Sequence, residues 1–172
     1  YLTKLKSLIV SANKLKRIPK NISNLTNLEF FSVSDNRLKK LSKEIGKLSN
    51  LRRLILSGNR LKKLPKEIGK LSNLRRLILS GNRLKKLLKN VGQLSKLRKL
   101  SLASNHLKGL PEEIGKLSDL HELILSGNRL KKLPKEIAQL TKLRKLDLRN
   151  NNFSEFEQKK IRQLLPNVRI TF

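Results

Sequence analysis

The sequence predicts an α/β solenoid, an arc or horseshoe whose concave side is a parallel sheet. The first observation is a fixed period of 23 residues, because LRRLILSGNRLKKLPKEIGKLSN at residues 51–73 recurs along the chain of 172 residues. Such periods are typical of arrays in which each unit packs on its neighbours. The second observation is that leucines stand at the first, fourth and sixth positions of the unit. This spacing includes the alternation of a strand, whose side chains point to opposite faces.

A third observation concerns charge. The formal net charge is +29, from 41 Lys and Arg against 12 Asp and Glu, and such a charge is by itself typical of a disordered basic tail. The leucine period argues against disorder, because the apolar residues recur where a core needs them.

The repeats predict a single domain over residues 1–172. Residues 1–4 match the end of a repeat, residues 5–142 hold six full repeats, and residues 143–172 hold a seventh, divergent repeat with a C-terminal cap. Positions are counted from the leucines that open the full repeats: Leu5, Leu28, Leu51, Leu74, Leu97 and Leu120. Because the chain begins inside a repeat, we expect its first apolar rung to be partly exposed, or covered by a neighbour or by residues absent from this sequence. Self-association through this end is one consequence.

Each repeat opens with its strand. Strands that recur in one direction must stack in parallel, and the intervening residues cross back on the other side. Asparagine at position nine, such as Asn59, follows the strand, where its amide can donate to and accept from backbone groups that the sheet leaves open. Proline at position fifteen, such as Pro65, has a fixed φ and suits an extended segment or the start of a short helix. We therefore expect short helical turns, partly 3₁₀, on the convex side.

The C-terminal residues predict a helix and a final strand. Ser154 is followed three residues later by Glu157, which is the pattern of a capping box, and Pro166 ends the helix. Two groups of apolar residues and two phenylalanines are expected to close the last rung. They are Ile161, Leu164 and Leu165 for the helix, Val168, Ile170 and Phe172 for the strand, and Phe153 and Phe156.

Residues that carry catalysis are scarce. The chain has no cysteine, which excludes disulfides, thiolate metal sites and a cysteine nucleophile. His106 and His121 stand at different positions of adjacent repeats and are expected at the surface. The serines at position seven, such as Ser57, have no histidine in their repeat to activate them. We therefore expect no enzymatic activity, no cofactor and no metal. No apolar run approaches the roughly 18 residues of a membrane span.

The repeat pattern LxxLxLxxNxLxxLPxxIGxLxx resembles the leucine-rich repeat over essentially the whole chain. The segments LPKEIGKLSNLRRLILSGNRL and FSEFEQKKIRQLLPNVRITF are similar to the repeats and the C-terminal ending of bacterial leucine-rich repeat proteins, the leptospiral group in particular. The resemblance implies binding of other molecules on the concave sheet, secreted or cell-surface placement, and host-directed partners. The many lysines and arginines depart from the Gln, Glu and Asp expected of that group, so the identity of a partner does not transfer.

The candidate binding residues lie on and beside the concave face. Leucines at positions one, four and six point inward, so positions three and five face solvent, and positions two and ten lie near the borders. The predicted contact residues are Phe30, Arg52, Arg53, Ile55, Arg60, Arg75, Arg76, Ile78, Arg83, Arg98 and Lys99. An apolar stripe flanked by arginine resembles a protein-binding surface. The alternative is that isoleucine only fills strand positions, covered by arginine stems, and that Phe30 packs on neighbouring side chains.

Three functions fit these residues. The first is a non-enzymatic module that binds an acidic protein surface. The second is binding of a polyanion, such as a sulfated glycan, an anionic surface polymer or nucleic acid. Sequence-specific nucleic-acid recognition is not expected, because few aromatic residues are free to stack on bases. The third is a structural or engineered array. A lysine ladder at position twelve, which includes Lys62, is either a solvated edge or an anion-binding strip.

Overall fold

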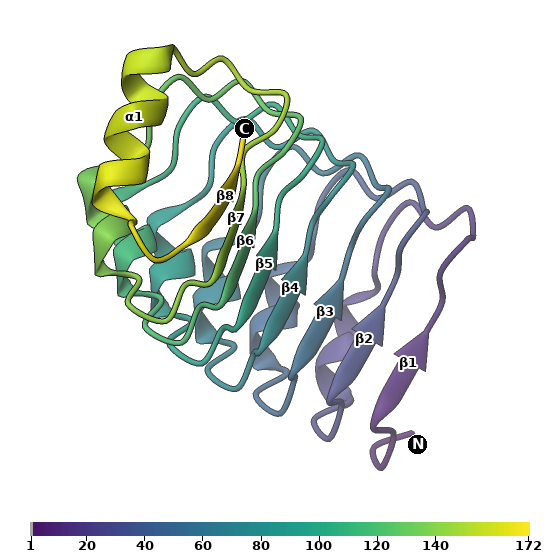
Figure 1. Cartoon of the computed structure of the whole chain (residues 1–172). Coiled ribbons are helices and arrows are strands. Elements are labelled where there is room, and N and C mark those ends of the chain that lie inside the picture. The colour runs from purple at the N-terminus through teal and green to yellow at the C-terminus, as the bar shows by residue number, and fades with distance from the viewer. Residues whose placement is uncertain (1) are drawn as a thin grey trace.

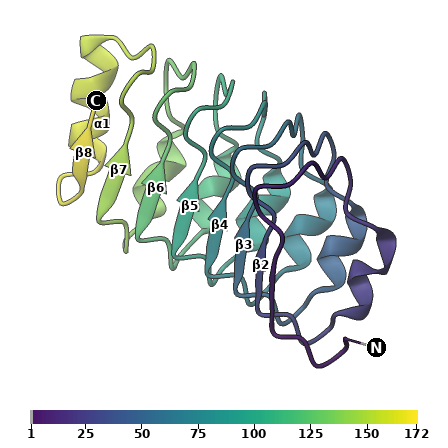
Figure 2. The same cartoon turned by 90° about the vertical axis from the view of Figure 1, so that its right-hand side faces the viewer.

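The computed structural model describes residues 2–172, and within them the predicted solenoid is confirmed. Eight strands of this segment form one open parallel sheet in chain order (Figure 1). The strands are β1 (Ser7–Ile9), β2 (Phe30–Ser32), β3 (Arg53–Ile55), β4 (Arg76–Ile78), β5 (Lys99–Ser101), β6 (Glu122–Ile124), β7 (Lys145–Asp147) and β8 (Arg169–Thr171). The sheet lines one side of the arc, and short helices line the other side (Figure 2).

The helices of the return segments are 3₁₀, as expected from the proline position. They are η1 (Lys20–Asn24), η2 (Lys43–Lys47), η3 (Lys66–Lys70), η4 (Lys89–Gln93), η5 (Glu112–Lys116) and η6 (Lys135–Gln139). Pro65 precedes η3 in an extended conformation, with φ −72° and ψ 149°. Ser42 and Leu88 replace proline before η2 and η4 and take the same extended conformation. The helical turn therefore recurs without the proline ring.

Strand pairing places equivalent positions of successive repeats side by side. Arg53 pairs with Arg76, Leu54 with Leu77, and Ile55 with Ile78. The same register continues through the sheet, because every step from β1 to β7 advances by one 23-residue unit. Leu51, Leu54 and Leu56 are fully buried in the core. Positions three and five consequently form the solvent side of the sheet.

The asparagines at position nine connect successive turns, as the sequence predicts. The Asn82 side-chain oxygen accepts a hydrogen bond from the Leu61 N–H at 3.0 Å. Its Nδ2 donates to the carbonyl oxygens of Leu56 and Leu79, at 2.9 and 3.0 Å. Each of these carbonyls also accepts from a second asparagine, Asn59 for Leu56 and Asn105 for Leu79. The amides thus form a continuous ladder inside the solenoid.

Position eight, just before each of these asparagines, has a positive φ. Glycine holds it in three repeats, at Gly58, Gly81 and Gly127. Ala12, Asp35, Ser104 and Asn150 hold it in the others, with φ between 52° and 55°. An L-residue with a side chain is disfavoured in this region. The turn geometry is therefore imposed by the stacked repeats rather than by glycine alone.

The C-terminal cap has the predicted helix and strand, but one of its residues lies elsewhere than predicted. Helix α1 (Glu155–Leu164) begins after Ser154, whose hydroxyl accepts from the Glu157 N–H at 3.3 Å. Phe153 packs edge-to-face on Phe172, with ring centroids 6.0 Å apart. Phe156 was expected to help close the last rung, but that prediction is wrong, because it is 75% exposed. Ile161 faces the core, and five residues of helix rotate the side chain by about 140°, so Phe156 points away.

The N-terminal rung is open. Leu2 is 71% exposed, and the inward residues Leu5, Leu8 and Val10 are half-buried, whereas their equivalents in the next repeats are buried. An apolar hollow of about 340 Å³ lies here, lined in part by Leu8, Val10 and Leu15. Tyr1, the first residue of the expected partial repeat, lies outside the described residues. Among residues 2–172, none of the helices has the length and hydropathy needed to cross a membrane.

Candidate functional site

The middle of the concave face carries arginine beside isoleucine. Arg53 and Arg76 are exposed neighbours on β3 and β4, while Ile55 and Ile78 beside them are half-buried. The strand alternation explains this arrangement, since Leu54 and Leu77 between them point into the core. The structure thus brings four of the predicted contact residues onto one surface.

Acidic residues neutralise part of the surrounding charge. Arg52 pairs with Glu29 at 3.4 Å, and Lys142 pairs with Asp119 at 2.5 Å. Within the described chain, two arginines on the β4 rung and one each on the β3 and β5 rungs make no ion pair with a carboxylate. We call Arg53, Arg75, Arg76 and Arg98 the concave arginine patch. Arg144 and Arg169, on the rungs of β7 and β8, also lack an ion pair in the described chain, but the four arginines of the patch lie on three adjacent rungs.

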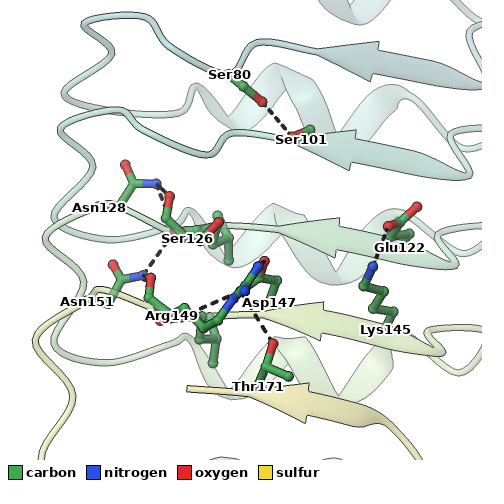
Figure 3. A network of polar contacts seen from close by, with 12 residues as sticks. Ser80, Ser101, Glu122, Ser126, Asn128, Lys145, Asp147, Arg149, Asn151 and Thr171 are labelled. Atoms are coloured by element: carbon green, nitrogen blue, oxygen red, sulfur yellow. Dashed lines mark hydrogen bonds and ion pairs between the residues drawn. The ribbon is translucent and has the colours of Figure 1, made fainter.

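Glu122 was not among the predicted contact residues, yet it determines which lysines are available. Its carboxylate contacts Lys99 at 2.6 Å and Lys145 at 3.3 Å (Figure 3 shows Glu122 and Lys145). Burial raises the pKa of the Glu122 carboxyl, but the hydrogen bonds from both lysines outweigh burial and the pKa is lowered. Lys99, a predicted contact residue, is thus already paired. The signal in the sequence was position three, which reads Lys, Glu, Lys in consecutive repeats.

Two other predicted groups differ from the arginine patch in their surroundings. Phe30 on β2 was expected to be exposed, but it is half-buried, in register with Arg53. Arg60 and Arg83 are exposed and follow the strands, and their backbone N–H groups donate to the preceding turn at 2.9 Å. They lie at the border of the concave face, as position ten predicts, and not within the arginine patch.

A buried carboxylate lies near the C-terminal end of the concave face. Asp147 on β7 is 4% exposed and accepts from Arg149 Nε at 2.9 Å and Nη2 at 2.8 Å (Figure 3). The Thr171 hydroxyl donates to it at 3.3 Å. The hydrogen bonds from Arg149 lower the pKa of Asp147, although burial opposes them. Both carboxylate oxygens of Asp147 accept hydrogen bonds from within the protein. This network therefore stabilises the end of the sheet.

Neither histidine belongs to a cluster of possible metal ligands in the part of the chain that the structure describes. Over residues 2–172 no group of three or more His, Asp or Glu side chains is placed to hold a metal ion. His121 Nδ1 lies 2.6 Å from the backbone oxygen of Asp119. His106 is half-buried and lies within the segment that follows β5.

Comparisons with known proteins agree with this geometry. The family described as "Leucine-rich repeat region" matches residues 81–165. The family described as "Leucine rich repeat" matches residues 26–84 and 49–107. The comparison with curated proteins gave no significant match.

Three solved structures illustrate the similarity. A leucine-rich repeat protein of Leptospira interrogans is 39% identical with a TM-score of 0.77, over 99% of this chain and 50% of that one. The leucine-rich repeat ectodomain of an Arabidopsis thaliana membrane receptor kinase, solved with Casparian strip integrity factor 2, is 34% identical with a TM-score of 0.80. That alignment covers 88% of this chain and 19% of the plant chain.

The third is an internalin from Listeria monocytogenes, 24% identical with a TM-score of 0.84, over 98% of this chain and 48% of that one. This likeness shows the fold alone. The chain spans half the length of the Leptospira protein and less of the other two. The periodic leucines, the asparagine ladder, the parallel sheet and both family matches agree, and the chain belongs to the leucine-rich repeat family.

Proposed function

We propose that this protein is a non-enzymatic binding module whose concave face recognises an acidic protein surface. The observation that carries the proposal is the concave arginine patch, four arginines on adjacent rungs that lack carboxylate partners in the described chain. Guanidinium groups bind carboxylates through paired, charge-assisted hydrogen bonds. A partner with two or more spaced carboxylates would neutralise adjacent rungs, which lie about 4.8 Å apart.

The isoleucines favour a protein over a purely charged ligand. Ile55 and Ile78 are half-buried between the arginines, and a partner side chain placed over them would remove further apolar surface from water. Arginine beside apolar groups is enriched at the centres of protein interfaces. The ion pairs of Glu29 and Glu122 reduce the net charge on either side. The contact surface would accordingly centre on β3 and β4.

We also infer that the protein is of the leptospiral type, with 23-residue PKEIG repeats, and acts as a secreted or cell-surface protein toward host molecules. Support comes from the 39% identity with the Leptospira interrogans protein. The plant receptor kinase ectodomain was solved in complex with Casparian strip integrity factor 2, so a leucine-rich repeat ectodomain forms a complex with another molecule in that case.

The test is a protein and glycan array at physiological salt with two charge-matched variants. Arg53→Glu with Arg76→Glu changes the arginine patch, and Lys39→Glu with Lys62→Glu makes the same charge change at position twelve. We expect the first variant to lose at least about tenfold in affinity for the acidic partner, and the second to lose far less. Equal losses in both variants would contradict a specific concave surface.

Polyanion binding is the alternative, and the observation that favours it is the exposed lysine at position twelve of all six full repeats. Together with a net charge of +29, this ladder would attract heparin or DNA by counterion release. Retention on both matrices across a salt series measures it. Complete elution by physiological ionic strength, with equal effects of the two variants, is the outcome expected of non-specific attraction.

A further inference from the structure

A second recessed surface lies outside the concave face. Positions ten to fifteen follow each strand and form what we call the post-strand edge, where the chain leaves the arrowheads in Figure 1. A groove of about 700 Å³ opens on this edge at the turns that follow β4, β5 and β6. Leu87, Leu110 and Pro111 supply apolar surface within it, and Gly109 lies among them.

Gly109 departs from the repeat pattern at this point. Position thirteen carries a long basic side chain in the other five full repeats, at Arg17, Lys40, Lys63, Lys86 and Lys132. A Cβ atom built on Gly109 meets no atom within 4 Å, so the missing side chain leaves open space. The next residue, Leu110, is more exposed than its equivalents. It is half-buried, while Leu64 and Leu87 are 3% and 6% exposed.

A second residue of the same repeat, His106, also departs from the repeat pattern and lines the same groove. Position ten is arginine in the repeats on either side, at Arg83 and Arg129, but is histidine at His106. His106 is half-buried and lines the same groove. A shorter ring in place of arginine and a glycine in place of lysine both widen the space above Leu110. Two departures at separate positions of one repeat therefore meet in a single groove.

The rim of the groove is basic. Lys85, Lys86, Lys108 and Arg129 line it, and all four are exposed. None of them makes an ion pair with another residue of the described chain. A sulfated glycan or nucleic-acid backbone would use this rim but not the apolar surface of Leu87, Leu110 and Pro111. The combination fits an apolar side chain that is flanked by carboxylates.

We propose that this groove, the Gly109 groove, binds an acidic peptide segment of a partner protein through one inserted apolar side chain. The site lies on the post-strand edge, so it is separate from the concave arginine patch and does not rest on it. A partner that follows the concave face past Arg83 and Arg129 would reach the groove from its border. The groove then adds selection for an apolar side chain to the charge attraction of the basic rim.

The test uses two blocked peptides, Glu-Glu-Leu-Glu-Glu and Glu-Glu-Ser-Glu-Glu, titrated to millimolar concentration and followed by NMR. We expect saturable shifts of the Gly109 amide and of the Leu87 and Leu110 methyl groups. The leucine peptide should bind at least about fivefold more tightly, because it alone buries an apolar side chain. Equal affinity of the two peptides, or no saturable shift at these groups, would overturn the proposal.

Variants that fill the groove show whether its shape or its charge determines peptide binding. Gly109→Lys restores the residue that four other repeats carry, and Gly109→Gln fills the same space without charge. We expect both variants to fold and to weaken binding of the leucine peptide at least about fivefold. Charge attraction alone predicts the opposite for Gly109→Lys, which adds one positive charge. Unchanged or tighter binding by Gly109→Lys would therefore refute the groove, while Arg53→Glu with Arg76→Glu should leave peptide binding there intact.

Discussion

Replacing Asn82 by alanine should lower the free energy of unfolding by about 3 kcal/mol, because its amide is shared between two turns. The change leaves the buried Leu61 N–H without its partner, and an orphaned buried donor costs about 1–3 kcal/mol. The carbonyls of Leu56 and Leu79 each lose one donor but keep another, from Asn59 and Asn105. Each lost bond there costs about 0.5–1.5 kcal/mol, so the total cost is about 2–6 kcal/mol, and the expected value lies toward the lower end because both carbonyls keep a donor.

Asn13 provides the matched control. It is exposed, and its side chain donates only to the carbonyls of Val10 and Ser11, at 3.2 and 2.9 Å. The Val10 carbonyl also accepts from Asn36 at 3.0 Å. Asn13→Ala should therefore cost less than about 1 kcal/mol. The asparagine ladder predicts a clear difference between two chemically identical substitutions.

Urea unfolding followed by circular dichroism measures both variants, with the slope against urea compared to show that the same surface is exposed. Hydrogen exchange gives a local measurement, because the Leu61 amide should lose protection in Asn82→Ala and keep it in Asn13→Ala. A cost for Asn82→Ala no larger than that for Asn13→Ala would refute the reasoning. It would mean that water or a backbone shift satisfies the freed groups.

Two further predictions concern the turns and the C-terminal end of the sheet. Gly58→Ala should destabilise the protein by about 1–2 kcal/mol, since φ is +63° and the new Cβ would lie 2.0 Å from Asp35 Oδ1. Gly109→Ala has open space and should be neutral or stabilising by up to about 1 kcal/mol, and thermal unfolding of both variants checks the contrast. Arg149 lowers the pKa of Asp147, so the stability that this carboxylate adds is present above its ordinary pKa of 3.8 and is lost as the pH falls through the lower folded value. The midpoint of thermal unfolding should consequently fall less steeply in strong acid for Asp147→Asn than for the original protein, and parallel curves would contradict this role.

The fold could be predicted because its determinants repeat. Apolar residues, mostly leucine, recur at positions one, four and six. A departure in one repeat, such as Phe31 or Val33, therefore does not hide the pattern that the other repeats show. Asn59 and its equivalents gave the inner ladder for the same reason, since their amides face the same turn each time. Ser154 and Glu157 predicted the start of α1 through a local pattern of two residues.

The candidate site could be predicted only in outline. Period and alternation identify which positions face solvent, but not which charges meet. Glu122 contacts two lysines because a side chain at position three reaches both neighbouring rungs, and this depends on rotamers. The prediction for Phe156 was wrong because it grouped this residue with the other apolar residues of the cap. Ile161 shows which side of α1 is buried, and Phe156 lies on another side. The Gly109 groove depends on a missing side chain, which a pattern of present residues does not reveal.

Because the strands from β1 to β7 all pair in the same register, the number of repeats can change without altering how the core packs. Each unit supplies apolar residues, mostly leucine, at the same inward positions and the same asparagine, so a unit that is duplicated, removed or exchanged still meets similar neighbours on both sides. Its outward residues change place as a set, by one rung of about 4.8 Å. Recombination between repeats can therefore reorder or extend the row of outward side chains in a single genetic step, without any compensating change in the interior.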